Sequence, residues 1–126
     1  MTTATREVCV AIVGSRDFAD RALLDATMDA FVREHGAPTG VVSGGARGAD
    51  TLGQRWAQAR GVPCTVLAPE WAKHGRSAGF RRSADIVAAA THVVAFPHPR
   101  GSGTQHTVEL ARRRGLPVTV VTQWAV

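Results

Sequence analysis

The sequence predicts an α/β protein with a Rossmann-like, doubly wound, parallel five-stranded sheet in a three-layer αβα arrangement, as a single domain over residues 1–126. Two observations predict this class. Short β-branched runs alternate strictly with helical patterns, as parallel strands with crossover helices require. Three glycine-containing turns each follow a strand run and precede a helical pattern. Such turns gather at the carboxyl edge of the sheet, where ligands bind.

The first predicted strand is Val8–Val13, a continuous apolar run that suits a central strand covered on both faces. Residues 19–35 follow as a helix with apolar side chains at helical spacing: Ala22, Leu23, Ala26, Ala30 and Phe31. Gly36 and Pro38 supply the stop signals that end this helix.

The same alternation continues to the end of the chain. Further strands are predicted at 41–42, 64–67, 92–96 and 118–121, and further helices at 48–60, 81–90 and 104–114. The helix over 48–60 places Leu52, Trp56 and Ala59 on one face. Before the third helix lies a polar segment, residues 69–76, that is long enough to fold over a pocket. Its Trp71 could stack on a base or anchor the segment as an apolar contact.

Composition narrows the classes of function. With 126 residues, 44% hydrophobic and 20% charged, the chain suits one compact domain. It has no apolar run of spanning length and no apolar signal core, so we expect a cytoplasmic protein without a membrane segment. Cys9 and Cys64 fall within strands and are expected to be reduced core thiols. His74, His98 and His106 lack ligand spacing, so neither a metal nor a cofactor is expected.

The net charge of +5 is carried almost entirely by arginine, since Lys73 is the single lysine. Arginine binds phosphate through two parallel hydrogen bonds and keeps its charge at all relevant pH values. A basic surface of this kind fits either a nucleotide or a nucleic acid, and the charge does not choose between them.

The glycine turns predict an anion site. Their candidate ligand-binding residues are Gly14, Ser15, Arg16 and Asp17; Ser43, Gly44, Gly45, Arg47, Gly48 and Asp50; and Gly101, Ser102, Gly103 and Thr104. Glycine lets backbone N–H groups approach a ligand, and the helix start that follows adds unpaired donors. No Walker sequence occurs, and Ser43 replaces the first glycine of a dinucleotide fingerprint. Either the turns hold one phosphate-bearing ligand or each is a tight connection.

Charged side chains sharpen this expectation. Arg16, Arg47, Arg81 and Arg82 lie close to predicted helix starts, where a cation is unfavourable unless an anion compensates it. A phosphate would supply the anion; the alternative is pairing with nearby aspartates or water. Asp17 and Asp50 could accept hydrogen bonds from ribose hydroxyls or cap helices. Thr104 is expected to cap its helix and donate to phosphate. Glu109 could be a catalytic acid or base, or pair with Arg113.

Four motifs together resemble a known family. They are Val13–Phe18, Val42–Asp50, Glu70–Gly79, and Gly103-Thr104 with His106-Thr107, and they extend over nearly the whole chain. The pattern resembles the YspA-like branch of the SLOG superfamily, which also contains the Lonely Guy cytokinin-activating phosphoribohydrolases and the DprA/Smf DNA-uptake proteins. The resemblance implies a Rossmann-like fold, a nucleotide or nucleotide-derived ligand, and self-association, in which Trp124 could take part.

Two positions depart from these relatives. Lonely Guy enzymes carry a glutamate for N-glycoside cleavage after their glycine-threonine motif, and Thr107 occupies that position here. Branch members place asparagine after the second arginine of the helix that follows the polar segment, whereas this chain has Ser83. The first departure favours binding over cleavage, with Thr107 as a ligand-binding residue, and the second implies a different ligand selectivity.

Three hypotheses for function follow. The first is a sensor or sequestering module for an ADP-ribose, NAD-derived or cyclic nucleotide ligand. The second is an enzyme that cleaves an N-glycosidic bond of a nucleotide, using Asp17, Asp50 or Glu109. The third is single-stranded nucleic-acid binding as in DprA, which the basic charge supports and the scarcity of aromatic residues opposes. A homo-oligomer is expected and a membrane partner is not.

Overall fold

The computed structural model describes residues 7–68, 75–99 and 103–122. Its centre is a five-stranded parallel sheet with the strand order β3-β2-β1-β4-β5. The strands are β1 (Cys9–Gly14), β2 (Gly40–Ser43), β3 (Cys64–Val66), β4 (His92–Phe96) and β5 (Val118–Val120). The helices are α1 (Arg21–His35), α2 (Ala49–Ala59), α4 (Ala78–Ala89) and α5 (Gly103–Arg113), and a short 3-10 helix, η1 (Gly75–Ser77), precedes α4.

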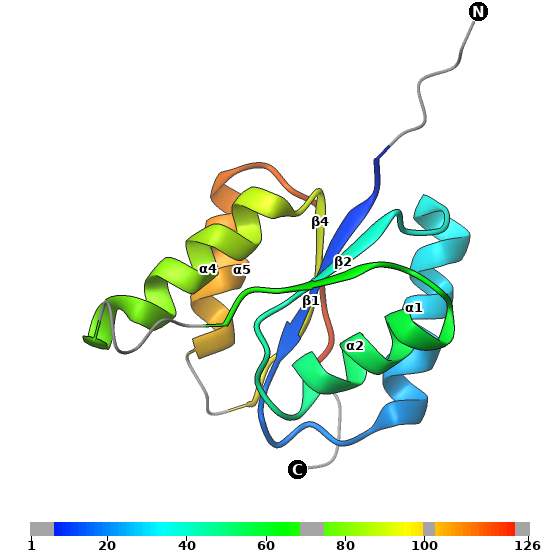
Figure 1. The fold of residues 1–126 in the computed structure, drawn as a ribbon, viewed down its shortest axis with the longest axis horizontal. Helices are drawn as coiled ribbons and strands as arrows, with labels where there is room; N and C mark the ends of the chain where they lie inside the picture. The colour runs from blue at the N-terminus through cyan, green and yellow to red at the C-terminus, as the bar shows by residue number, and fades with distance from the viewer. Residues whose placement is uncertain (1–6, 69–74, 100–102, 123–126) are drawn as a thin grey trace, which may run out of the picture.

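The helices cover the sheet on both faces. Figure 1 shows α1 and α2 on one side of the strands and α4 and α5 on the other. Each face has its own apolar core, and β1 contributes to both: Val10 and Ile12 pack toward α1 and α2, whereas Ala11 and Val13 pack toward α4 and α5. The predicted Rossmann-like, doubly wound α/β fold is therefore confirmed, and β1 is the doubly covered central strand that its apolar run indicates.

Three details of the helices differ from expectation. The buried stripe of α1 consists of Leu24, Met28 and Phe31, while the predicted Ala22, Ala26 and Ala30 are exposed. Larger side chains at spacings of three and four residues bury more apolar surface than alanines, which explains the shift. In α2, Ala57 is buried and Ala59 is exposed. Helix α4 begins at Ala78 rather than near Arg81, because η1 leads directly into it.

The two cysteines begin β1 and β3 with free thiols, as expected. Both are half-buried at the margins of the two cores rather than inside them. Burial raises the pKa of both thiols, with Glu7 adding to the effect at Cys9. Neither thiol therefore has the lowered pKa of a reactive cysteine.

The order in which strands are added to the sheet reverses beside β1. The chain passes from β1 to β2 and β3 toward one edge, then crosses back to β4 and continues to β5 at the other edge. Strands β1 and β4 are neighbours in register, with Gly14 opposite Phe96 at their carboxyl ends. The segments that follow these two ends diverge to opposite faces, which leaves a crevice between them.

Candidate functional site

The turns after β1, β2 and β4 are packed backbone against backbone at the carboxyl edge. A Cβ atom on Gly14 would lie 2.6 Å from the carbonyl oxygen of Phe96 and 2.7 Å from Cβ of Ala49. The Ser15 N–H donates to the Phe96 carbonyl at 2.9 Å, and the Ala49 N–H donates to the Ser15 carbonyl at 3.1 Å. Gly48, with φ +81°, lies so close to Ser15 that a Cβ there would be 2.3 Å from its carbonyl oxygen. Glycine is thus required for contacts between the turns themselves.

A cavity of about 530 Å³ opens where these turns meet α4 and α5. It lies beyond the ends of β1 and β4, at the reversal of strand order where ligands bind in open α/β sheets. Its lining residues are Val13, Gly14, Ser15, Arg16, Asp17, Ala46, Asp50, Arg82, Ile86, His98, Thr104 and Thr107.

Many of the residues predicted from the sequence meet in this cavity. Those that line it are Gly14, Ser15, Arg16, Asp17, Asp50, Arg82, Thr104 and Thr107. They come from the turn after β1, from the first turn of α2, and from facing parts of α4 and α5. Residues separated by more than 90 positions along the chain therefore converge on one site.

The second glycine turn supports the cavity more than it lines it. The Ser43 hydroxyl is fully buried and accepts from the Gly45 N–H at 3.2 Å and from Nε2 of Gln54 at 2.9 Å. It also lies 3.3 Å from the Asp50 carbonyl, to which it donates. A Cβ on Gly44 would come within 2.7 Å of Oδ2 of Asp50. This turn holds Asp50 in position.

Several predicted residues lie elsewhere. Arg47, Arg81 and Glu109 are exposed and do not line the cavity. Thr104 is the second residue of α5 rather than its cap, so the predicted capping role is wrong. Thr104 does line the cavity, as predicted. Gly103 is the first residue of α5. Trp71, Gly101 and Ser102 lie outside the described residues.

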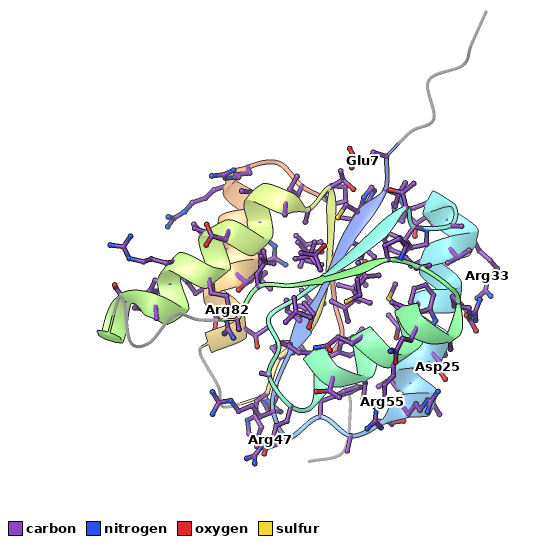
Figure 2. All side chains as sticks on the ribbon, in the orientation of Figure 1. Glu7, Asp25, Arg33, Arg47, Arg55 and Arg82 are labelled. Atoms are coloured by element: carbon purple, nitrogen blue, oxygen red, sulfur yellow. The ribbon has the colours of Figure 1, made fainter. Side chains whose placement is uncertain are left out.

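Arg82 reaches from α4 to the turn after β2. Its Nη1 donates to the Gly44 carbonyl at 3.3 Å. Its Nε is buried and has no hydrogen-bond partner among the described residues. The neighbouring Arg81 turns away and donates from Nε to the Ser77 hydroxyl at 3.2 Å. Figure 2 shows Arg82 beside the start of α5 and Arg47 apart from it at the tip of the edge.

Asp50 is a buried carboxylate beside this cation. It is 4% exposed and accepts a hydrogen bond from the Ala46 N–H at 3.3 Å. Burial raises the pKa of Asp50 to about 6, against the opposing effects of backbone hydrogen bonds and the charge of Arg82. Asp17 is exposed in contrast, and its Oδ2 lies 3.8 Å from Nε2 of His98. The site thus holds one buried and one exposed carboxylate.

Four lining residues were missed by the sequence interpretation: Val13, Ala46, Ile86 and His98. Two carried a usable signal. Ile86 follows Arg82 by one helical turn and so shares its face. His98 comes two residues after β4, at the carboxyl edge. Val13 and Ala46 enter the wall only through the packing of the turns.

Metal and membrane features are absent from the described part of the chain. No group of three or more histidine, cysteine, aspartate or glutamate side chains is placed there to hold a metal ion. None of the described helices is both long enough and apolar enough to cross a membrane.

Comparison with known proteins gives a family match and two structural likenesses. The model of the YspA, cpYpsA-related SLOG family matches residues 8–74. The Gene 61 protein of Mycobacterium phage D29 is 40% identical over 118 residues, which cover 86% of this chain and 92% of that protein.

Among solved structures, DNA processing protein A (DprA) from Streptococcus pneumoniae superposes with a TM-score of 0.72 at 19% identity, over 95% of this chain and 52% of that one. DprA from Helicobacter pylori, described for its single-stranded DNA binding mode, gives a TM-score of 0.69 at 20% identity, over 93% of this chain and 66% of that one. The chain therefore spans about half of the first DprA and about two thirds of the second. At these identities the likeness shows a shared fold.

Proposed function

Because the chain belongs to the YspA, cpYpsA-related SLOG family, we propose that it binds a nucleotide-derived, phosphate-bearing ligand in the cavity at the carboxyl edge of the sheet. The ligand is of the ADP-ribose, NAD-derived or cyclic nucleotide type, and the protein acts as a sensor or sequestering module. The observation that carries the proposal is the Arg82 side chain, a cation that lines the cavity and whose buried Nε has no hydrogen-bond partner among the described residues. A buried unpaired donor costs free energy that a bound anion would offset.

Other groups in the cavity suit the same ligand. Arg16 adds a second cation, and the Ser15 hydroxyl lies in the same turn. Thr104 stands in the first turn of α5, where the helix dipole favours negative charge. A volume of about 530 Å³ falls within the range of small-molecule sites, roughly 300–1,000 Å³.

The adjacent arginines of α4 provide a matched test. Titration calorimetry with ADP-ribose, NAD, AMP and cyclic AMP is carried out on the wild type, Arg82→Gln and Arg81→Gln. Loss of a charge-assisted hydrogen bond costs about 1.5–3 kcal/mol, so Arg82→Gln should weaken binding by about 10- to 100-fold. Arg81→Gln should bind as the wild type does, because Arg81 lies outside the cavity. The proposal is contradicted if none of the four nucleotides binds, or if the two substitutions weaken binding equally.

A second candidate function is cleavage of a nucleotide N-glycosidic bond. Asp50 supports it, because a carboxyl group in the cavity with a pKa of about 6 is suited to proton transfer near neutral pH. Glu109, being exposed outside the cavity, offers no such support. Chromatography after incubation with AMP and NAD would detect a released base that Asp50→Asn fails to release. No product over many hours removes this alternative for those substrates.

A third candidate is single-stranded nucleic-acid binding, suggested by the DprA-like fold and the net charge of +5. Binding of oligothymidylate should then fall steeply with salt. Exposed arginines such as Arg47 and Arg81 should contribute as much as Arg82, and AMP should not compete. Saturable competition by AMP instead favours the small-molecule ligand.

We extend the proposal to a homo-oligomer. Phe80 on α4 is 62% exposed, which is unusual for a large apolar side chain and suits a contact with a second copy. Native mass spectrometry would reveal both the number of subunits and the mass of any co-purified ligand.

A further inference from the structure

Two buried hydroxyl groups join α4 and α5 beside the cavity. Ser83 of α4 and Thr107 of α5 are each 4% exposed. Oγ1 of Thr107 donates to Oγ of Ser83 at 3.0 Å, and Oγ of Ser83 donates to the Gly79 carbonyl at 3.2 Å. Thr107 also lines the cavity. One side chain thus belongs both to a helix–helix hydrogen bond and to the ligand site.

The direction of these hydrogen bonds leaves the Thr107 hydroxyl without a free proton. A hydroxyl group has one proton and two acceptor lone pairs, and a carbonyl oxygen can only accept. In the structure the Ser83 hydroxyl donates to the Gly79 carbonyl, and the Thr107 hydroxyl donates to Ser83. With its proton committed to Ser83, the Thr107 hydroxyl can only accept further hydrogen bonds. A ligand group packed against it must be a hydrogen-bond donor or apolar.

The cavity is therefore lined by groups of two kinds. The donors and cations of Ser15, Arg16 and Arg82 suit phosphate oxygens, which only accept. Thr107 and the ionised Asp50 suit groups that donate. A phosphate placed against Thr107 would bring two hydrogen-bond acceptors together without a proton between them. An uncharged part of the ligand must therefore contact Thr107.

We infer that Thr107 accepts a hydrogen bond from a ribose hydroxyl of the ligand, and that its bond to Ser83 makes the site select ribonucleotides over deoxyribonucleotides. This inference rests on the proposed function. Ribose suits this position because its hydroxyls can donate to Thr107 while the attached phosphate binds the cations that line the same cavity. Ser83 is a positioning residue, since it acts on the ligand only by holding the Thr107 proton.

The test compares AMP with 2′-deoxy-AMP, 3′-deoxy-AMP and IMP by titration calorimetry at pH 8. Wild-type protein should bind at least one deoxy analogue about fivefold or more weakly than AMP, the equivalent of about 1 kcal/mol for one hydrogen bond. Thr107→Val, which is close in shape but has no hydroxyl, should bind AMP and that analogue equally. Thr107→Ser should keep the preference, whereas Ser83→Ala, which frees the Thr107 proton, should reduce it. Thr104→Val, the same change one turn earlier on α5, should weaken both ligands by the same factor.

Each outcome decides the inference. Equal affinity of wild-type protein for AMP and both deoxy analogues overturns it, and this arm needs no variant to fold. A preference that persists in Thr107→Val also overturns it. Weakening confined to IMP, which lacks the amino group, assigns Thr107 to the base instead of the sugar. If AMP fails to bind while ADP-ribose, NAD or cyclic AMP binds, only the inference is overturned. If none of the four binds, the proposed function is contradicted as well.

Discussion

Replacing Asp50 by asparagine should stabilise the protein at neutral pH, because the native fold buries this carboxylate and burial of a charge is unfavourable. Asp50 is 4% exposed, and burial raises its pKa from the ordinary 3.8 to about 6. Below about pH 3.8 the group is protonated in both the folded and unfolded chains. Between this pH and about 6 the unfolded chain releases the proton while the folded chain retains it. Stability is therefore lost as the pH rises through this window and stays at the lower level above it.

The size of the effect follows from the difference in proton affinity. Each tenfold difference is worth about 1.4 kcal/mol, so a rise from 3.8 to about 6 corresponds to about 3 kcal/mol of stability lost by pH 8. Asparagine has no charge to bury, and its side-chain oxygen can still accept from the Ala46 N–H. The variant should therefore gain up to about 3 kcal/mol at pH 8 and only about 0.5 kcal/mol at pH 4.

Urea denaturation at pH 4, 6 and 8 measures this difference directly. Asp85→Asn serves as the matched control, because it makes the same change at an exposed carboxylate on α4, and it should gain far less stability at pH 8 than Asp50→Asn does. If Asp50→Asn is less stable than the wild type at pH 8, or if its gain is the same at pH 4, the burial cost of Asp50 has been misjudged. Because Asp50 lines the cavity, a gain in stability together with a loss of ligand binding would mark it as a functional residue held at a cost in stability.

Two further predictions concern the turns and helices that position the site. Gly48→Ala should destabilise the protein by about 3 kcal/mol or more and abolish ligand binding, because its Cβ would lie 2.3 Å from the Ser15 carbonyl oxygen at φ +81°. Gly61→Ala is the control, because Gly61 has φ +68° but a Cβ there would have nothing within 4 Å. It should cost only about 1–2 kcal/mol and leave ligand binding intact. Thermal denaturation compares the two variants, and equal losses of stability would refute the predicted clash at Gly48. Asp20→Ala should cost about 1 kcal/mol in urea denaturation by removing the α1 cap at the Leu23 N–H, 3.0 Å away, whereas Asp20→Asn should retain most of it.

The local sequence was sufficient to predict where the strands and helices lie, but not which face of each helix is buried. The apolar run of β1 and the glycines after it identify a doubly covered strand and its turn, because both signals lie within a few neighbouring residues. The buried stripe of α1 was misassigned, since apolar spacing alone ranks Ala26 as highly as Met28. Only the packing of the helix against the sheet decides which face of the helix is buried.

For the candidate site too, the sequence predicted some features and only the tertiary structure decided others. The residue types of an anion site at the carboxyl edge can be read along the chain, because strand, turn and helix succeed one another in order. Tertiary structure alone distinguished Arg82, which lines the cavity, from the adjacent Arg81, which does not. It also brought Thr107 to Ser83 across two helices and buried Asp50 beneath the turn after β2. Burial and hydrogen-bond direction depend on which distant segments meet, and the order of residues along the chain carries that information only through the folded structure.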